Sequence, residues 1–240
     1  PETAVFSAVD AKSIYDIPIL FRDQKIDEFM LKQFKLKSKR LNLSPWNNYR
    51  LKAGKCKKTV KIAMIGKYVD LADSYKSLNE ALYHAGIINN RLVEITYLDS
   101  EQITKASVKK LKVMDGILVP GGFGNRGIEG KILAAQYARV NKIPYLGICL
   151  GMQISVIEFA RNVLKLKNAN STEFNSKTKH PVVALVDEWK DNSGKKIISD
   201  KKNMGGTMRL GSQDCTLSKD SLAYKMYEKL AINERHRHRY

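Results

Sequence analysis

The sequence predicts an α/β fold in which a mostly parallel central sheet carries helices on both faces. Three observations predict it. From residue 60 onward, short apolar runs alternate with segments that have helical spacing of apolar residues. The runs contain consecutive apolar residues, and glycine-containing turns follow two of them. Continuous apolar strands joined by amphipathic helices are typical of parallel sheets covered on both sides.

The elements are expected in a regular order along the chain. The expected strands are VKIAMIGKY (60–68), LVEITYLD (92–99), GILVP (116–120) and PYLGIC (144–149), and the expected helices are SYKSLNEALYHAG (74–86, closing on Gly86), EGKILAAQYARV (129–140) and MQISVIEFARNVL (152–164). Because ligands of such sheets bind at the carboxyl ends of the strands, the turns after the third and fourth strands are the candidate site.

The first 60 residues differ in character from the rest. Residues 1–40 show helix-like apolar spacing, interrupted by Pro18, and residues 41–59 are rich in Pro, Asn, Gly and charge, which is linker composition. We therefore expect a helical tail (1–40), a linker (41–59) and one α/β domain (60–240).

Composition excludes several classes of protein. With 43% hydrophobic residues the chain can fill a core, but it has no apolar run of about 18 or more residues, and its N-terminus lacks the order of a signal peptide, so a cytoplasmic location without a membrane partner is expected. The three cysteines are widely spaced, so neither a disulfide framework nor a metal site is expected. The net charge of +18 comes without a nucleic-acid-binding signature, so nucleic acid is not an expected partner.

One candidate motif is VPGGFGNRG, residues 119–127, called here the glycine loop. Its glycines allow the backbone to turn with exposed N–H groups and let a ligand approach closely. It matches neither the phosphate-loop pattern nor the dinucleotide-binding pattern. Taken alone, it is also compatible with a simple tight turn.

The second candidate motif surrounds Cys149. Gly147, Ile148, Cys149, Leu150 and Gly151 have the form of a nucleophile elbow, in which small flanking residues let a strained turn push one side chain into a cleft. The positive end of the following helix is expected to lower the pKa of the thiol. The N–H of Leu150, and that of Gly122 or Phe123 in the glycine loop, could then stabilise an oxyanion. The alternative is that Cys149 is a small buried apolar residue.

Five sequence segments together resemble those of a known protein family. GGFGNRGIEGK, PYLGICLGMQ, NANSTEF, GGTMRLG and RHRHRY occur in the same order in the glutamine amidotransferase domain of the CTP synthase family, which the chain resembles over nearly its whole length. VFSAVDAKSIYDIPILF is similar to the end of the preceding synthetase domain. The resemblance implies the flavodoxin-like fold of class I glutamine amidotransferases.

The resemblance also implies a role for each matching residue. Cys149 would attack the side-chain amide of glutamine and form a thioester, while Gly122 and Leu150 stabilise the oxyanion beside Phe123. Gln153, Glu173 and Arg239 would hold the α-amino and α-carboxylate groups of glutamine. A carboxylate suits the ammonium and a guanidinium suits the carboxylate.

The resemblance further implies partners outside this chain. The ammonia would pass to UTP activated by ATP, with Mg²⁺, in the synthetase domain of the same polypeptide. GTP would act as an allosteric activator, and the full-length enzyme would be a homotetramer. No cofactor is expected in the glutamine amidotransferase domain itself.

One part of the family pattern has no counterpart among these residues. In the family, a histidine and a glutamate in a His-Pro-Glu motif complete the triad beyond RHRHRY, and none of His84, His180, His236 and His238 matches that motif. The sequence therefore leaves open a chain that is truncated or assembled from joined segments, and a thiol that works without this base. It also leaves open a noncatalytic glutamine-binding or regulatory module, or a DJ-1-like cysteine protein.

Overall fold

The computed structural model describes residues 4–11, 13–38, 41–67, 72–186, 188–190, 196–198 and 208–240. The chain divides into two compact units: unit 1 comprises Pro1–Val60 and Tyr75–Glu94, and unit 2 comprises Lys61–Ser74 and Ile95–Tyr240. Two predicted segments extend outside the described residues, namely the end of the first expected strand at residue 68 and residues 205–207 of GGTMRLG. Every helix in the described ranges is too short or too polar to cross a lipid bilayer.

Unit 1 is helical. Its elements are η2 (Ile14–Asp16), α1 (Ile17–Asp23), α2 (Ile26–Gln33), α3 (Ser44–Ala53) and α4 (Lys76–Ile88), the last preceded by η3 (Ala72–Tyr75). Pro18 and Pro45 lie in the first turns of α1 and α3, where the missing N–H has no helical partner to lose. Pro18 therefore starts a helix where an interruption was expected, and α3 lies within the segment expected as a linker. Helix α4 continues past Gly86 to Ile88, and a Cβ atom on Gly86 would lie 2.6 Å from Val93 Cγ2 and 2.9 Å from the Arg91 carbonyl oxygen.

An aromatic cluster joins three parts of unit 1. The rings of Tyr15, Trp46, Tyr49 and His84 pack with centroids 5.3 to 6.5 Å apart. The Tyr15 hydroxyl donates to Glu80 at 2.8 Å, and the Trp46 indole N–H donates to the Tyr15 carbonyl at 2.8 Å. Aromatic packing and the hydrogen bonds of Tyr15 and Trp46 together connect η2, α3 and α4.

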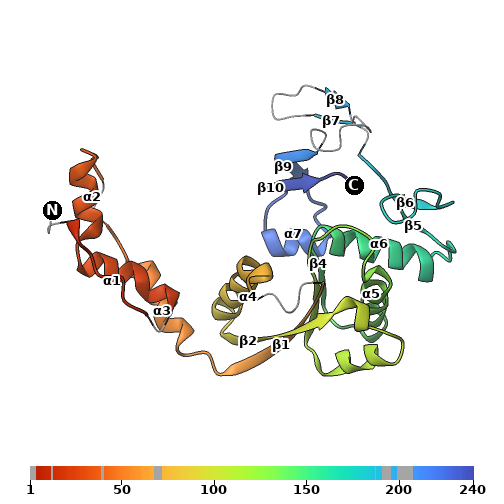
Figure 1. Cartoon of the computed structure of the whole chain (residues 1–240), viewed down its shortest axis with the longest axis horizontal. Helices are drawn as coiled ribbons and strands as arrows, with labels where there is room; N and C mark the ends of the chain where they lie inside the picture. The colour runs from red at the N-terminus through yellow and green to blue at the C-terminus, as the bar shows by residue number, and fades with distance from the viewer. Residues whose placement is uncertain are drawn as a thin grey trace. The chain divides into compact units, whose positions relative to one another are not determined.

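The central sheet contains four strands in the order β2-β1-β3-β4. Figure 1 labels β2, β1 and β4 of this sheet. The strands are β1 (Lys58–Gly66), β2 (Arg91–Asp99), β3 (Gly116–Val119) and β4 (Tyr145–Gly147). Strands β1 and β3 are parallel with Ala63 opposite Ile117, and β3 and β4 are parallel with Val119 opposite Gly147. The predicted fold class, a parallel sheet with helices on both faces, is confirmed. From β1 the chain passes to β2 on one side and then crosses to β3 on the other side of β1, so the strand order reverses between β1 and β3. In such sheets, ligands usually bind at the carboxyl ends of the strands at this point.

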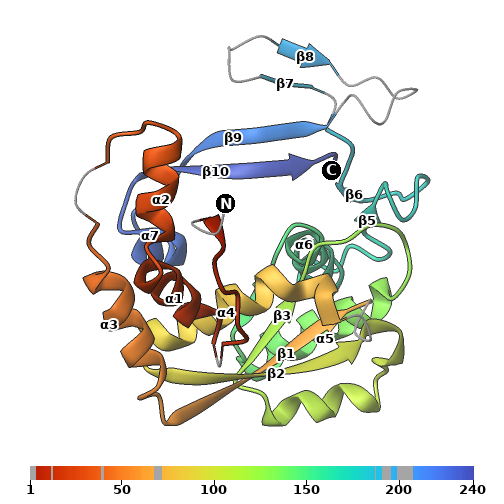
Figure 2. The same ribbon diagram turned by 60° about the vertical axis from the view of Figure 1, so that its left-hand side comes forward.

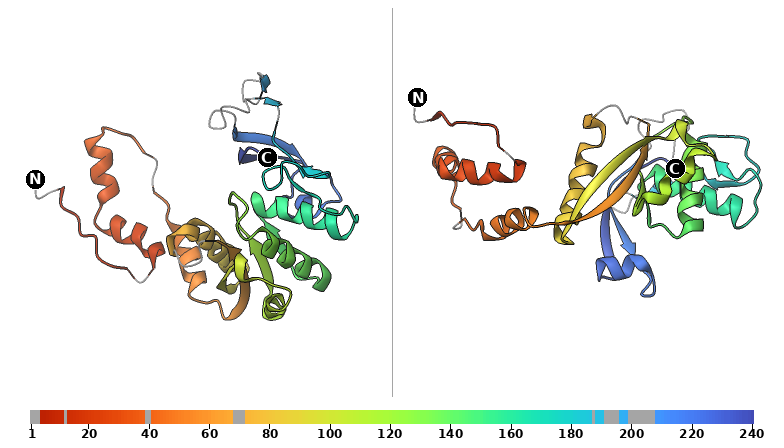
Figure 3. Two further views of the ribbon diagram at one scale, coloured as in Figure 1. Left: turned by 45° about the vertical axis from the view of Figure 1, so that its right-hand side comes forward. Right: turned by 90° about the horizontal axis from the view of Figure 1, so that it is seen from below.

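The core of unit 2 forms where helices cover this sheet. Its helices are η4 (Ser100–Gln102), η5 (Ser107–Val113), α5 (Ile128–Asn141) and α6 (Leu150–Asn162). One apolar cluster joins β1, β3, η5 and α5 around Ile65, Leu111 and Val119. A second joins α5 to α6 through Ile132 and Ile154, and these two helices lie side by side (Figure 3). The buried face of α6, packed against α5, therefore fixes the helix that begins beside Cys149.

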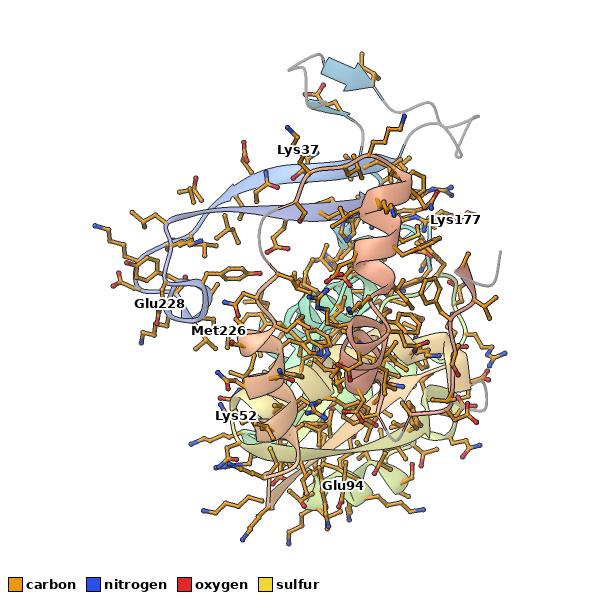
Figure 4. All side chains as sticks on the ribbon, turned by 90° about the vertical axis from the view of Figure 1, so that its left-hand side faces the viewer. Lys37, Lys52, Glu94, Lys177, Met226 and Glu228 are labelled. Atoms are coloured by element: carbon orange, nitrogen blue, oxygen red, sulfur yellow. The ribbon has the colours of Figure 1, made fainter. Side chains whose placement is uncertain are left out.

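The rest of unit 2 consists of short strand pairs. They are β5 (Asn170–Ser171) with β6 (Pro181–Val183), β7 (Glu188–Lys190) with β8 (Lys196–Ile198), and β9 (Arg209–Thr216) with β10 (Ala231–His238). Strands β9 and β10 run antiparallel side by side (Figure 2), and α7 (Leu222–Tyr227) lies between them in the chain, with Met226 and Glu228 at its end (Figure 4). The sequence analysis did not predict this hairpin, which carries most of RHRHRY.

Candidate active site

Cys149 occupies a strained turn between β4 and α6. Its backbone has φ 53° and ψ −107°, a conformation that costs free energy for a residue with a side chain. A Cβ atom on Gly147 would lie 2.4 Å from the carbonyl carbon and oxygen of Gly151, and one on Gly151 would lie 2.0 Å from the oxygen of Val119. The turn is tied to β3 by the Ile148 N–H, which donates to Val119 at 3.0 Å. The two glycines are therefore sterically required, as a nucleophile elbow demands.

The glycine loop lies directly against this thiol. A Cβ atom on Gly121 would lie 3.4 Å from Cys149 Cβ and 3.9 Å from its Sγ. The backbone N–H groups of Leu150 and Gly122 lie near the Cys149 sulfur and favour its thiolate form. Phe123, the next residue of the loop, is 60% exposed. Two donors from different strand ends therefore converge on one sulfur atom.

The pKa of the Cys149 thiol is raised, not lowered. Burial is the main cause, because it disfavours the thiolate, and the Glu173 carboxylate adds to the shift. The N–H groups of Leu150 and Gly122 lower the pKa, but burial outweighs them. The expectation of a thiolate-rich Cys149 was wrong because the position of the thiol at a helix N-terminus does not offset its loss of hydration. An attack by Cys149 therefore needs a base.

Glu173 projects from the NANSTEF segment toward the same place. The segment is fixed by the Thr172 N–H, which donates to Val183 at 2.9 Å, and by the Ser171 hydroxyl, which accepts from the Glu173 N–H at 3.1 Å. The Glu173 carboxylate accepts a hydrogen bond from the Gly124 N–H at 2.8 Å. It thus connects NANSTEF to the glycine loop, within electrostatic range of Cys149.

Gln153, in the first turn of α6, contacts the end of RHRHRY. Gln153 is buried, and its side-chain amide donates to the Tyr240 carbonyl at 3.1 Å. Burial and the nearby Glu173 carboxylate raise the pKa of Tyr240, while Arg239 lowers it, so these three side chains are electrostatic neighbours. The Arg239 Nε is buried and has no hydrogen-bond partner among the described residues. A guanidinium with an unused donor is suited to bind a carboxylate.

The structure thus brings the predicted residues into one region of unit 2. Gly122 and Leu150 contact the thiol, Glu173 lies near it, and Gln153 and Arg239 reach this region through Tyr240. None of the four histidines has a hydrogen bond or ion pair with Cys149 in the part of the chain that is described. Nor do any three His, Cys, Asp or Glu side chains of these residues form a group that could hold a metal ion.

Two residues of this region were not predicted. Lys67 directly follows β1, and its ammonium donates to the carbonyl oxygen of Phe123. Tyr240 ends the RHRHRY segment and accepts from Gln153. The signal for Lys67 was present in the sequence, because the residue after one strand of a parallel sheet lies beside the loop after the neighbouring strand.

Comparison with known proteins assigns this arrangement to a family. The model of the class-I glutamine amidotransferase family matches residues 70–240. The chain belongs to this family. A solved structure of the glutaminase domain of Trypanosoma brucei CTPS with bound acivicin is 42% identical to the chain, with a TM-score of 0.65. The match covers 75% of this chain and 67% of that one.

The resemblance drawn from the five sequence segments is confirmed by these two matches. Membership of the class-I glutamine amidotransferase family favours the interpretation of Cys149 as a nucleophile over that of a small buried apolar residue. It equally favours a glutamine amidotransferase over a DJ-1-like protein. The individual roles of the predicted site residues stay predictions, namely those of Cys149, Gly122, Leu150, Phe123, Gln153, Glu173 and Arg239.

Proposed function

We propose that this chain is the glutamine amidotransferase domain of a CTP synthase and that it hydrolyses glutamine through Cys149. The observation that carries the proposal is the convergence of the Gly122 and Leu150 N–H groups on a cysteine held in a strained elbow. Membership of the class-I glutamine amidotransferase family supports it, as does the 42% identical CTPS glutaminase domain, whose bound acivicin is a glutamine analogue.

The reaction follows from the geometry around the sulfur. As a base takes the thiol proton, the Cys149 sulfur would attack the carbonyl carbon of the glutamine side-chain amide, and the negative charge that develops on its oxygen would be stabilised by the Gly122 and Leu150 N–H groups. The carbon–nitrogen bond then breaks, and ammonia leaves after a general acid has protonated its nitrogen. Water cleaves the resulting thioester, which releases glutamate and restores the thiol.

Glutamine recognition would use the charged residues around this centre. Glu173 supplies a carboxylate for the α-ammonium of glutamine, and Arg239 supplies a guanidinium whose Nε has no partner among the described residues for the α-carboxylate. Gln153, buried one turn into α6, is proposed to order the same end of the substrate together with Tyr240. Phe123 would lie beside the bound side chain.

The wider role is proposed from the same family relationship. The ammonia would aminate UTP to CTP in a synthetase domain of the same polypeptide, in pyrimidine biosynthesis. ATP and Mg²⁺ would bind in that domain, and GTP would activate glutamine hydrolysis. We also propose a cytoplasmic homotetramer for the full-length enzyme.

The decisive experiment measures ammonia release from glutamine together with covalent labelling by acivicin. We expect acivicin to modify Cys149, and peptide mass spectrometry locates the adduct. The other two thiols are internal controls, because Cys56 is buried and Cys215 is exposed. Preferential acivicin labelling of Cys215 would refute the proposed nucleophile.

A second arm tests the need for a base. Because no histidine among the described residues contacts Cys149, the 240-residue polypeptide should release ammonia roughly 10² to 10⁴ times more slowly than a form extended through a His-Pro-Glu segment. Glutamine binding is expected in both forms. Equal rates would mean that a group within these 240 residues serves as the base.

A further inference from the structure

One peptide unit of the glycine loop is held at both of its ends. The carbonyl oxygen of Phe123 accepts a hydrogen bond from the Lys67 ammonium, and the N–H of Gly124 donates to the Glu173 carboxylate at 2.8 Å. The Lys67 ammonium also donates to the carbonyl oxygen of Gly124 at 3.3 Å. The Phe123–Gly124 peptide is therefore clamped between a cation and an anion, each on the side of the peptide that suits its charge.

The glycine loop also makes a hydrogen bond to the backbone of Lys67. The Arg126 guanidinium donates to the Lys67 carbonyl oxygen at 3.0 Å and pairs with Glu101 at 3.0 Å. The end of β1 and the glycine loop are thus joined twice, once through each side chain. This pairing is possible because β1 and β3 are neighbouring parallel strands, whose carboxyl ends lie at the same edge of the sheet.

The loop needs such a clamp because its own sequence constrains it weakly. A Cβ atom on Gly122 would meet only Leu150, at 3.4 Å, which is ordinary van der Waals contact. Glycine peptides rotate readily between conformations, so local sterics alone do not point the Gly122 N–H at the Cys149 sulfur. Fixing the next peptide but one limits this rotation.

We propose that Lys67 is a positioning residue for glutamine hydrolysis: its ammonium, together with the Glu173 carboxylate, holds the Phe123–Gly124 peptide so that the Gly122 N–H stays directed at Cys149. The inference rests on the proposed function. It gives Glu173 two tasks, since the carboxylate that would receive the α-ammonium of glutamine also accepts from the Gly124 N–H. The hydrogen bonds of the Lys67 ammonium to Phe123 and Gly124 lie in the glycine loop, so its proposed effect on the thiol passes through this loop.

The test compares variants in an active enzyme that contains this chain. Lys67→Met should lower kcat for glutamine hydrolysis roughly 10-fold, less than the 10² or more expected when an oxyanion donor is removed outright, and should change KM by less than about twofold. Lys67→Arg, which keeps a cationic donor, should lie closer to wild type. The matched control is Lys61→Met on the same strand, because Lys61 is exposed and only its backbone makes a hydrogen bond.

Two further measurements separate positioning from folding. Alkylation of Cys149 by iodoacetamide forms no oxyanion and depends on the Gly122 N–H only through the pKa of the thiol, so its rate in Lys67→Met should fall less than kcat does, with an unchanged melting temperature. Glu173→Gln keeps an oxygen that can accept from Gly124 but loses the charge for the α-ammonium, so it should raise KM more than it lowers kcat. If Lys67→Met does not fold, Lys67→Gln, which is too short to reach both carbonyls, carries the same expectation.

The outcomes distinguish this inference from the proposed function. A wild-type enzyme that releases no ammonia from glutamine overturns the proposed function. If the wild-type enzyme releases ammonia, a Lys67→Met variant with kcat within twofold of wild type, or with a change in KM alone, overturns the role of Lys67. The proposed function is then unaffected. Parallel losses of kcat, alkylation rate and melting temperature in both Lys67→Met and Lys67→Gln would also overturn it, because Lys67 would then only support the fold.

Discussion

The elbow around Cys149 and the glycine loop lie on two sides of one sulfur atom, and each directs a backbone N–H at it. The elbow is determined by contacts within five residues and one neighbouring strand, since Gly147 and Gly151 leave no room for a Cβ atom. In the glycine loop, a Cβ atom on Gly121 or Gly122 would make only ordinary van der Waals contacts, and the loop is held by Lys67 and Glu173, which are distant in sequence, and by its own Arg126. A rigid nucleophile can thus face a donor whose position depends on several other parts of unit 2.

The largest effect is expected when the elbow itself is filled. Gly151→Ala would place a methyl group 2.0 Å from the Val119 oxygen, so β3 and α6 must separate. We expect the free energy of unfolding to fall by about 3 kcal/mol or more and Cys149 to lose its reactivity toward acivicin. Denaturant unfolding measures the first effect. Gly122→Ala is the control, with a change below about 1 kcal/mol; equal destabilisation by both substitutions would contradict the comparison.

The next largest effect is expected from a substitution that removes a hydrogen-bond donor from the glycine loop. Gly122→Pro deletes the N–H that points at the sulfur, so glutamine hydrolysis should slow by roughly 10² or more, while ammonia supplied directly still supports CTP formation in the complete enzyme. Steady-state kinetics with each nitrogen source measures both rates. Gly122→Ala, which keeps the N–H, should retain most of the activity. Loss of both reactions in Gly122→Pro would instead indicate misfolding.

A smaller effect concerns the buried charge next to the loop. Lys131 on α5 is 2% exposed, and burial, with Lys67 and Arg126 adding to the effect, lowers its pKa to about 8 from 10.5. Between these two pH values the unfolded chain binds more protons than the folded one, so this lysine makes the folded state more stable as pH rises from 8 to 10.5.

Lys131→Met should therefore raise the free energy of unfolding at pH 7 by roughly 1–2 kcal/mol, and its advantage over wild type should shrink as pH rises through that window. Urea unfolding at several pH values measures the difference. Lys109→Met, at an exposed position with a similar loss of charge, should show no such trend. A pH-independent advantage for Lys131→Met would contradict the expectation.

The smallest expected effect concerns the influence of the Glu173 charge on the pKa of the Cys149 thiol. The Glu173 carboxylate raises the pKa of Cys149, so Glu173→Gln should lower it and speed iodoacetamide alkylation near neutral pH by roughly two- to threefold at low salt. The rate against pH, followed by mass spectrometry of the Cys149 peptide, measures the shift. The exposed Cys215 should react at an unchanged rate. A slower Cys149 reaction in the variant would have the wrong sign.

Much of the α/β part could be predicted because its signals are local. The four strands of the central sheet and the helices around residues 74–86, 129–140 and 152–164 occur where apolar runs and helical spacing placed them, with boundaries shifted by a few residues. Pro18 and Pro45 were misinterpreted, because a proline starts a helix or ends one according to its neighbours. The β9-β10 hairpin was not predicted, since its arginines and histidines give no clear two-residue apolar alternation.

For the candidate site, the sequence by itself determined the elbow, because its glycine spacing expresses a steric need within one turn of chain. It also determined the family, through five segments in a fixed order. Only the tertiary structure decided that Lys67 and Glu173 hold opposite ends of one peptide, and that burial raises the pKa of Cys149 above what its helix N-terminus suggested. The reason is that both depend on atoms from other parts of the chain: hydrogen bonds between strand ends and the loss of water around a thiol arise only when those parts pack together.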